Sequence, residues 1–317
     1  RVVALTQDDA SPGPYRVDVL STQWNGAPLP ACAETWQSFP PVEGVPEWLS
    51  TPESALALET NDPLVILAGK LIMAGAVDAG SCPSNGLLYN GAANACGLDL
   101  ARSLVKQYQN QFDNQIWNSS QHFNIPARLI KNLFRQETQF WSASHGSYGE
   151  HGIGQLSWLG ADTLLLWSPE FYWGFCSDIL SPSTCSIGYS GLSIENQALL
   201  RGAVLRRIDT TCTDCEQGVD WAQAQQSVPV FSQVIKANCE QVGQSVQNIT
   251  RQPAGLASDY ESLWRITLAN YNVGSGCIGK ALNQSWSDSK RLDWPTVAAN
   301  LEPYCAGAIN YVQQIEP

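Results

Sequence analysis

The fold of this chain is decided by residues 126–140, which read PARLIKNLFRQETQF, and by the glycine-spaced turn GEHGIGQ at residues 149–155. In the first stretch Pro126 suits the first turn of a helix, and apolar side chains then recur at spacings of three and four, the period of one helix face. The members of this apolar stripe are Leu129, Ile130, Leu133 and Phe134. Glu137 continues the stripe, so the sequence predicts a buried helix whose core-facing side ends in an acid.

Glu137 therefore has the position of a partly desolvated carboxyl beside a turn. Three polar side chains are predicted on the other faces of the helix: Lys131, Asn132 and Arg135. A carboxyl at the margin of an apolar face loses hydration, which raises its pKa and keeps it protonated near neutrality, as a general acid requires. The alternative is a helix-end glutamate that pairs with a nearby arginine.

Composition describes a globular chain with a strong acidic excess. The chain has 317 residues, of which 44% are hydrophobic, and its 12 Trp and 10 Tyr supply aromatic surface for a core and for stacking on sugars. The net charge of −12 makes nucleic acid an unfavourable partner. The best candidate for a membrane span, residues 64–76, is shorter than the roughly 20 apolar residues a span needs and contains Lys70. We therefore expect no membrane span.

Ten cysteines, an even number, predict up to five disulfides and an oxidising compartment, either extracellular or in the cell envelope. Sequence does not determine the connectivity, but three local pairs are candidates: Cys82 with Cys96, Cys176 with Cys185, and Cys277 with Cys305. Cys212 and Cys215 have the spacing of a zinc or redox pair, yet no second pair and no nearby His complete a ligand set. We expect no metal and no cofactor. The chain begins at Arg1, as a chain does after a signal peptide is removed or after trimming.

The chain divides into two regions in this interpretation. Residues 1–97 form an N-terminal extension of unknown role, with an irregular, mostly extended leader over residues 1–50 and a short strand around residues 15–20. A buried helix is expected at residues 63–76, and a loop stapled by cysteines at residues 80–97.

The main domain, residues 98–317, is predicted to be mostly helical. Its first helix is expected over residues 99–119, and the capping box Ser258-Asp259-Tyr260-Glu261 should begin another. Residues 171–191 are interpreted as a Cys- and Gly-rich loop. Further helices are expected over residues 162–167, 195–208 and about 303–315. The predicted fold class is therefore mainly α, with a partly irregular, disulfide-stapled N-terminal extension.

Four segments in this domain resemble motifs of one family. RQETQF at residues 135–140 resembles Gln-Glu-Ser-x-Phe, and GEHGIGQL at residues 149–156 resembles Gly-Ala-x-Gly-Leu-Met-Gln. LANYNVGSG at residues 268–276 resembles Ala-Tyr-Asn-Ala-Gly, and YVQQI at residues 311–315 resembles the closing helix Tyr-Val-x-x-Ile. In this order they are similar to the soluble lytic transglycosylase catalytic domain of the lysozyme-like superfamily, which is related to goose-type lysozyme. The extension has no counterpart there.

The resemblance implies a role for each matched residue. Glu137 would be the sole essential acid, protonating the glycosidic oxygen of a β-1,4-linked N-acetyl amino sugar. Gln155 and Tyr271 would line the groove, and Asn272 would also lie at the site. Gly152 would bring the backbone close to the substrate, because glycine allows a positive φ. The structural alternatives are that Gln155 satisfies its own loop and that Tyr271 is an ordinary core aromatic.

The same resemblance implies a reaction on peptidoglycan without a cofactor. The C6 hydroxyl of the sugar would capture the oxocarbenium-like carbon, giving a 1,6-anhydromuramyl end. This chain departs from the family at Glu150, where a small residue is usual and where goose-type lysozymes carry an acid. A second carboxylate could hold a water for inverting hydrolysis by a muramidase or chitinase, although Ser157 replaces the other acid of that pattern. Glu150 could equally be a solvated loop acid.

Two function classes follow from these observations. The first is a secreted enzyme that cleaves peptidoglycan or another N-acetylated glycan. The second is a non-catalytic glycan-binding or structural component of a surface or virion assembly, in which disulfides hold the fold as a scaffold. Retention of Glu137, Gln155 and Tyr271 favours the enzyme. Two further departures, Asn270 for the usual Ala and Cys277 after the glycines, indicate local adaptation of the third motif.

Overall fold

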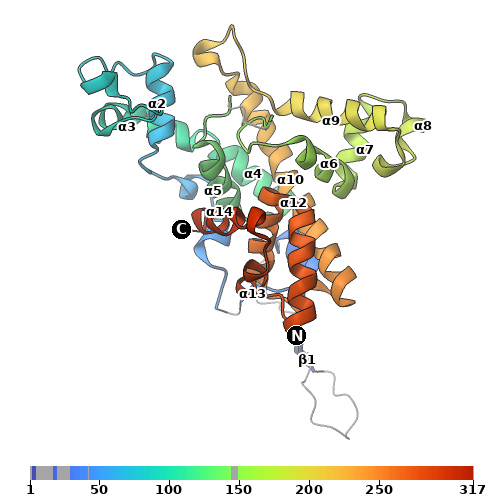
Figure 1. The fold of residues 1–317 in the computed structure, drawn as a ribbon. Coiled ribbons are helices and arrows are strands. Elements are labelled where there is room, and N and C mark those ends of the chain that lie inside the picture. Colours follow the sequence, from blue (N-terminus) through green and yellow to red (C-terminus); the bar gives the residue numbers. More distant parts are fainter. Residues whose placement is uncertain (1, 5–16, 20–28, 42, 144–148, 317) are drawn as a thin grey trace, which may run out of the picture.

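The protein is mainly helical, as predicted (Figure 1). The computed structural model describes residues 2–4, 17–19, 29–41, 43–143 and 149–316. Strands β1 (Val2–Ala4) and β2 (Val17–Val19) form an antiparallel pair in which Val3 lies opposite Asp18. β2 falls within the strand expected at residues 15–20, whereas residues 15, 16 and 20 lie outside the described residues, as do residues 1, 5–14, 21–28 and 42 of the predicted leader.

Two long helices form the centre of the molecule. α10 (Trp221–Thr250) and α12 (Tyr260–Ser289) pack against each other more extensively than any other pair of described elements. No helix was predicted over residues 221–250, because Pro229 and many Ser, Gln and Asn side chains interrupt its apolar pattern. Buried hydroxyls are satisfied inside the helix, as when Ser232 donates to the carbonyl of Val228 at 3.1 Å. Packing on several sides therefore stabilises a helix that propensity alone does not favour.

The expected helices over residues 63–76, 126–137, 162–167, 195–208 and 303–315 are present with shifted ends. They are α2 (Val65–Met73), α5 (Ala127–Thr138), α6 (Trp158–Trp167), α9 (Ile194–Ile208) and α14 (Gly307–Ile315), the last preceded by the 3₁₀ helix η6 (Pro303–Cys305). The prediction of one helix over residues 99–119 was wrong. It is two helices, α3 (Ala95–Asn110) and α4 (Asp113–Phe123), which separate where Phe112 is buried.

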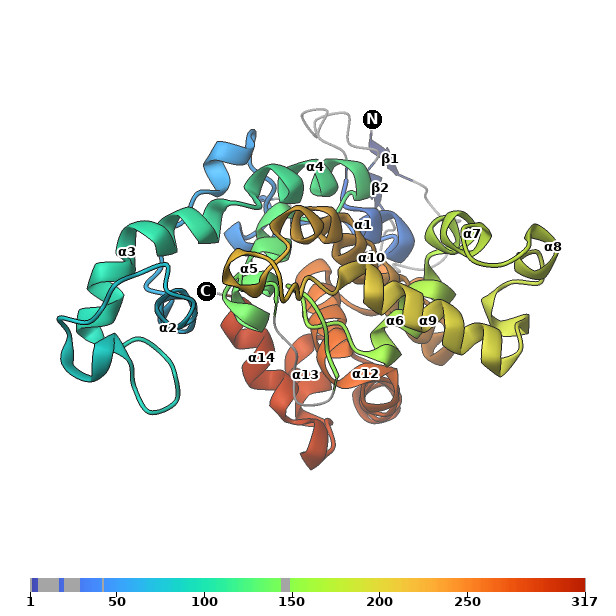
Figure 2. The same ribbon diagram turned by 90° about the horizontal axis from the view of Figure 1, so that it is seen from above.

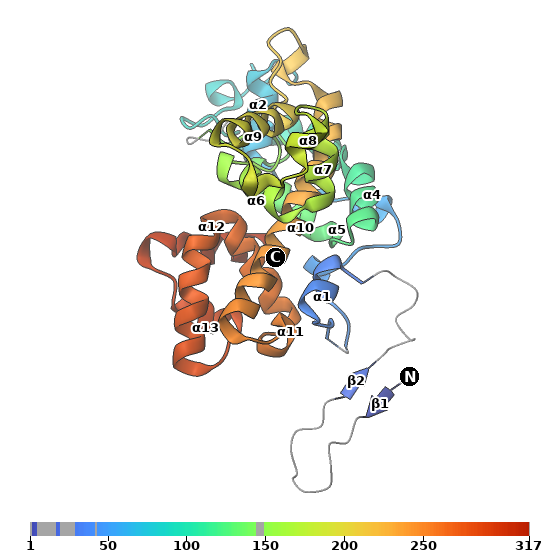
Figure 3. The same ribbon diagram turned by 90° about the vertical axis from the view of Figure 1, so that its right-hand side faces the viewer.

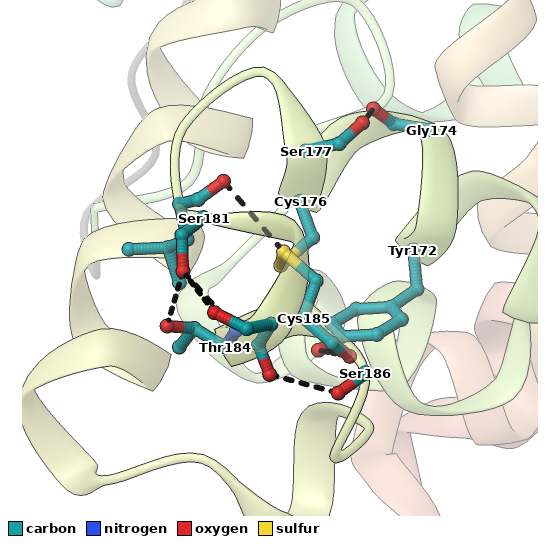
Figure 4. The surroundings of a disulfide bond; sticks show 10 residues. Tyr172, Gly174, Cys176, Ser177, Ser181, Thr184, Cys185 and Ser186 are labelled. Atoms are coloured by element: carbon teal, nitrogen blue, oxygen red, sulfur yellow. Dashed lines mark hydrogen bonds between the residues drawn. A yellow bond between two sulfur atoms is a disulfide. The ribbon is translucent and has the colours of Figure 1, made fainter.

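The interpretation of residues 171–191 as a loop was also wrong. They contain α7 (Pro169–Ser177), α8 (Pro182–Cys185) and the 3₁₀ helix η4 (Tyr189–Gly191). Figure 4 shows why this segment is ordered: the Cys176–Cys185 disulfide joins α7 to α8. The Tyr172 hydroxyl also donates to the carbonyl of Cys185 at 3.0 Å. A covalent link and a buried hydrogen bond thus order this segment, together with the buried Phe175 of α7.

The start of α12 differs from the predicted capping box by one residue. Asp259, not Ser258, is the N-cap and accepts from the backbone N–H of Ser262 at 2.8 Å. Ser258 instead donates to the carbonyl of Leu292 at 2.7 Å. The helix is interrupted at Gly274, whose φ of 82° favours glycine. Short helices α11 (Ala254–Ala257) and α13 (Trp294–Ala299) flank α12.

Residues before 98 pack into the same core as the residues after it. α1 (Ala31–Trp36) lies against α10, with α11 and α13 in the same lower part of the molecule (Figure 3). The leader is thus not wholly extended. The Cys32–Cys239 disulfide and a 2.9 Å hydrogen bond from the Trp36 indole to the carbonyl of Cys239 hold this six-residue helix in place. Three short 3₁₀ helices follow: η1 (Glu47–Leu49), η2 (Ala55–Leu58) and η3 (Pro83–Gly86).

All ten cysteines form disulfides. The three predicted local pairs are confirmed, and Cys212–Cys215 is a disulfide, not a zinc or dithiol pair.

Seen from above, α2 and α3 lie on one side of the molecule and α6 to α9 on the other, with α5 and α10 between them (Figure 2). Within the described residues, no helix combines the length and apolarity that crossing a membrane requires. The five disulfides are compatible with an oxidising compartment.

Candidate active site

The helix that carries Glu137 is buried on most of its sides. The apolar stripe of α5 is fully enclosed, but Lys131 is buried as well, which corrects the prediction that it faces outward. Its ammonium lies 2.7 Å from Asp113 Oδ1 on α4 and also donates to the carbonyl of Leu58. Burial lowers the pKa of Lys131 and raises that of Asp113, while each charge opposes this effect on the other. The pair fixes α5 against α4.

Two other polar side chains of α5 attach it to the last helix. Asn132 donates to the carbonyl of Ile315 at 3.0 Å, and Arg135 donates to the carbonyl of Gln314 at 3.0 Å. The C-terminal turn of α5 is therefore held beside α14. This contact places Glu137 opposite Tyr311.

Glu137 lies in the last turn of α5 and accepts a hydrogen bond from the Tyr311 hydroxyl. Its pKa is raised to about 7, mainly because burial disfavours the carboxylate. The Tyr311 hydrogen bond acts in the opposite direction, and the charge of Glu150 raises the pKa further. Near neutral pH a large fraction of Glu137 is therefore protonated and able to donate a proton.

The glycine turn packs tightly against the core beside Glu137. His151 and Leu156 form an antiparallel bridge, and Thr138 donates to the carbonyl of Ile153 at 2.9 Å. Gly152 has a φ of +72°, and a Cβ there would lie 2.6 Å from the carbonyl oxygen of Ile208. A Cβ on Gly154 would lie 2.4 Å from the Phe231 ring. Both glycines are thus required by close approach to the protein interior itself.

Tyr271 forms a hydrogen bond to this turn, and Gln155, the last residue of the turn, forms one within it. The Tyr271 hydroxyl donates to the carbonyl of Gly154, and Gln155 Nε2 donates to the carbonyl of Gly152 at 2.9 Å. Burial and the nearby charge of Glu137 hold the pKa of Tyr271 well above its usual value, so its hydroxyl stays a donor. Tyr271 therefore links α12 to the turn beside the acid. The Gln155 bond is the one expected of a side chain that satisfies its own loop.

The predicted site residues differ in how they interact with Glu137. Glu150 is partly buried after Gly149, and its charge acts on Glu137. Asn272 is exposed on α12, next to Tyr271 in the chain, and no hydrogen bond among the described residues joins it to Glu137. The structure thus gathers Glu137, Tyr271 and the turn, with Asn272 at the outside.

Two residues with clear roles were missed by sequence reasoning. Tyr311 bonds directly to Glu137, although it was noted only as the first residue of the closing-helix motif. Gln139, with a φ of 48°, directs its side-chain oxygen to the N-terminus of α2 and accepts from the N–H groups of Ile66 and Leu67 at 2.8 and 3.2 Å. A tyrosine hydroxyl on an apolar helix face was the available signal for Tyr311. Gln139 had none.

Comparison with known proteins leaves the family open. No protein-family model matches this chain, and neither the curated proteins nor the solved structures searched gave a match. The functional assignment therefore depends on the motifs and on the geometry around Glu137.

Elsewhere the described residues offer a weaker setting for proton transfer. Among the described residues, no group of three or more His, Cys, Asp or Glu side chains is arranged to hold a metal ion. A cavity of about 350 Å³ lies elsewhere, between η2, α3 and α4, with Lys106 and Asp113 in its lining. Its buried acid, Asp113, already pairs with Lys131. Glu137 is the stronger candidate for proton transfer, because its pKa lies near neutrality.

Proposed function

We propose that this protein cleaves the glycan strand of peptidoglycan at β-1,4 linkages between N-acetyl amino sugars, as a secreted lytic transglycosylase of the lysozyme-like superfamily. The single observation that carries the proposal is the state of Glu137. Its pKa of about 7 keeps about half of it protonated at pH 7, at the end of a buried helix and beside a glycine turn. The four motifs found in the sequence support the choice of glycan.

The first step is proton donation. The Glu137 carboxyl gives its proton to the glycosidic oxygen, the bond from that oxygen to C1 breaks, and positive charge develops on the sugar ring. Tyr311 then donates its hydrogen bond to the carboxylate that remains. A bond that strengthens as the carboxylate forms lowers the free energy of the charged state.

The second step returns the proton. The C6 hydroxyl oxygen of the same sugar bonds to C1 while its proton moves to Glu137, which is then ready for another cycle. The product is a 1,6-anhydro sugar, and no water is consumed. Tyr271 supports both steps by holding the turn through Gly154, because a site of this kind depends on fixed positions.

Hydrolysis is the second candidate, and Glu150 is the observation that favours it. Its charge acts on Glu137, as expected of a carboxylate in the same site. An inverting glycosidase uses a second carboxylate to activate water on the opposite side of the ring. In that reaction Glu150 would be the base, and the product would have an ordinary reducing end.

Mass analysis of the products tests both candidates. Wild-type protein and Glu137→Gln are incubated with purified peptidoglycan and, separately, with chitin oligomers. Anhydro-muropeptides from the wild type alone would support transglycosylation, whereas reducing-end products would favour hydrolysis. An absence of products from both substrates would contradict the enzymatic proposal and favour a non-catalytic scaffold.

A further inference from the structure

An exposed tryptophan lies directly after the candidate site. Trp158 is the first residue of α6, and the residue is 51% exposed. It lies three positions after Gln155 in the chain, a span of at most about 11 Å. An exposed indole beside this loop offers an aromatic surface on which a ligand ring can stack.

The Trp158 ring is held in place from one side. The guanidinium of Arg201 on α9 lies over the ring, 5.4 Å from its centroid. Arg201 is itself fixed by a 2.9 Å ion pair with Asp162, one turn beyond Trp158 on α6, and Asp162 also accepts a hydrogen bond from the Tyr189 hydroxyl. A ring held in this way loses little conformational entropy when a ligand binds.

From this arrangement we propose that Trp158 is a sugar-binding platform on which one N-acetylated sugar ring of the substrate stacks. The inference rests on the proposed glycan-cleaving function and adds a residue to it. Arg201 lies over one face of the indole, and a pyranose ring would stack its apolar C–H surface on the opposite face. Aromatic side chains recognise flat apolar surfaces in this way while their polar edges stay in water. Trp158 thus contributes binding and specificity, and Glu137 the chemistry.

Trp173 provides a matched control. It is 49% exposed, almost the same as Trp158, but it belongs to α7, which lies on the same side of the molecule as α6 and further from the centre (Figure 1). Its ring contacts the neighbouring Tyr172 at 5.5 Å, edge to face. A general effect of removing a surface indole should therefore appear in both variants.

The test measures the affinity of the inactive Glu137→Gln protein for chitin oligomers and for peptide-free peptidoglycan strands by calorimetry. Trp158→Ala in this background should weaken binding about three- to tenfold, the loss expected for one aromatic stacking partner. Trp158→Phe should retain most of the affinity, and Trp173→Ala all of it. Thermal unfolding of each variant excludes misfolding as the cause.

Cleavage by the catalytically intact protein separates this inference from the proposed function. Trp158→Ala should raise KM while leaving kcat close to the wild-type value. Normal products with unchanged KM and affinity in Trp158→Ala would overturn the sugar platform and leave the proposed function intact. If the wild type neither binds nor cleaves these glycans, both proposals are overturned.

Discussion

The hydroxyl of Tyr311 donates a hydrogen bond to Glu137, although the two residues are 174 positions apart in the chain. α14 and α5 meet at this bond, and Asn132 and Arg135 hold the two helices together next to it. α14 therefore influences the pKa of Glu137 on α5. A hydrogen bond to a carboxylate favours its charged form, whereas burial favours the neutral one. Burial is the larger effect here.

The first prediction concerns Tyr311→Phe. Removing the hydroxyl should raise the pKa of Glu137 above about 7, because the carboxylate loses its donor. A net hydrogen bond of about 0.5–1.5 kcal/mol corresponds to a shift of about 0.4–1.1 pH units. The alkaline limb of the pH profile of kcat/KM should move upward by that amount. Tyr304→Phe, which removes an exposed tyrosine hydroxyl on η6, is the control; a limb that stays in place in Tyr311→Phe would contradict the prediction.

The second prediction concerns Glu150→Gln. The charge of Glu150 raises the pKa of Glu137, so its removal should lower that pKa and shift the alkaline limb to lower pH. The change is thus opposite in sign to that in Tyr311→Phe. In a transglycosylase the rate at acidic pH should remain within a few-fold of wild type. A loss of about 10²-fold or more at every pH would instead make Glu150 a general base and favour hydrolysis.

The third prediction concerns stability. Glu137 has a folded-state pKa of about 7 and a usual value of 4.5, so its contribution to stability is fully present below pH 4.5 and is lost as pH rises through 7. Glu137→Gln removes the ionisable group. It should therefore be more stable than wild type at pH 8, by about 1–3 kcal/mol, and similar at pH 4.

Urea unfolding of both proteins at the two pH values measures this difference. Glu53→Gln, at an exposed position, is the control and should leave stability unchanged at both. Equal stability of Glu137→Gln and wild type at pH 8 would mean that the acid is not held in an unfavourable charged state. The raised pKa, and with it the general-acid role, would then lose its support.

The fourth prediction concerns the buried ion pair. Lys131→Met leaves Asp113 buried without its cation and should destabilise the protein by about 3–5 kcal/mol. The double variant Lys131→Met with Asp113→Leu should recover part of this loss, because neither charge then remains buried. Chemical unfolding of the two single variants and the double variant gives the coupling energy. Additive losses would show that the two side chains do not depend on each other.

Local patterns predicted the parts of the fold that local geometry determines. The spacing of Leu129 to Phe134 was enough to place Glu137 on a helix, because residues three and four apart share a face. The Cys82–Cys96 and Cys176–Cys185 pairs were also found, because each closes a short loop. The fold class followed from the same periodicity.

Features that depend on distant parts of the chain could not be read from such patterns. The Cys32–Cys239 disulfide joins residues 207 positions apart, and its formation depends on α1 lying against α10. Lys131 looked like a surface residue because its partner Asp113 belongs to another helix. Asn270, noted only as a departure from the usual Ala, donates to Asn238 and Gln241 on α10. Each of these contacts follows from packing, which sequence spacing does not report.

The last prediction concerns Gln139, which joins the segment after Glu137 to the N-terminus of α2. Its side-chain oxygen accepts from two backbone N–H groups that would otherwise lack helical partners. Gln139→Ala should cost about 0.5–2 kcal/mol of stability and speed hydrogen exchange at Ile66 and Leu67. Gln139→Glu should preserve both, because a carboxylate is an acceptor and its charge is favourable at a helix N-terminus. If Ala and Glu variants exchange at the same rate, the side chain does not cap α2, and the lobe of α2 and α3 is positioned by its other contacts.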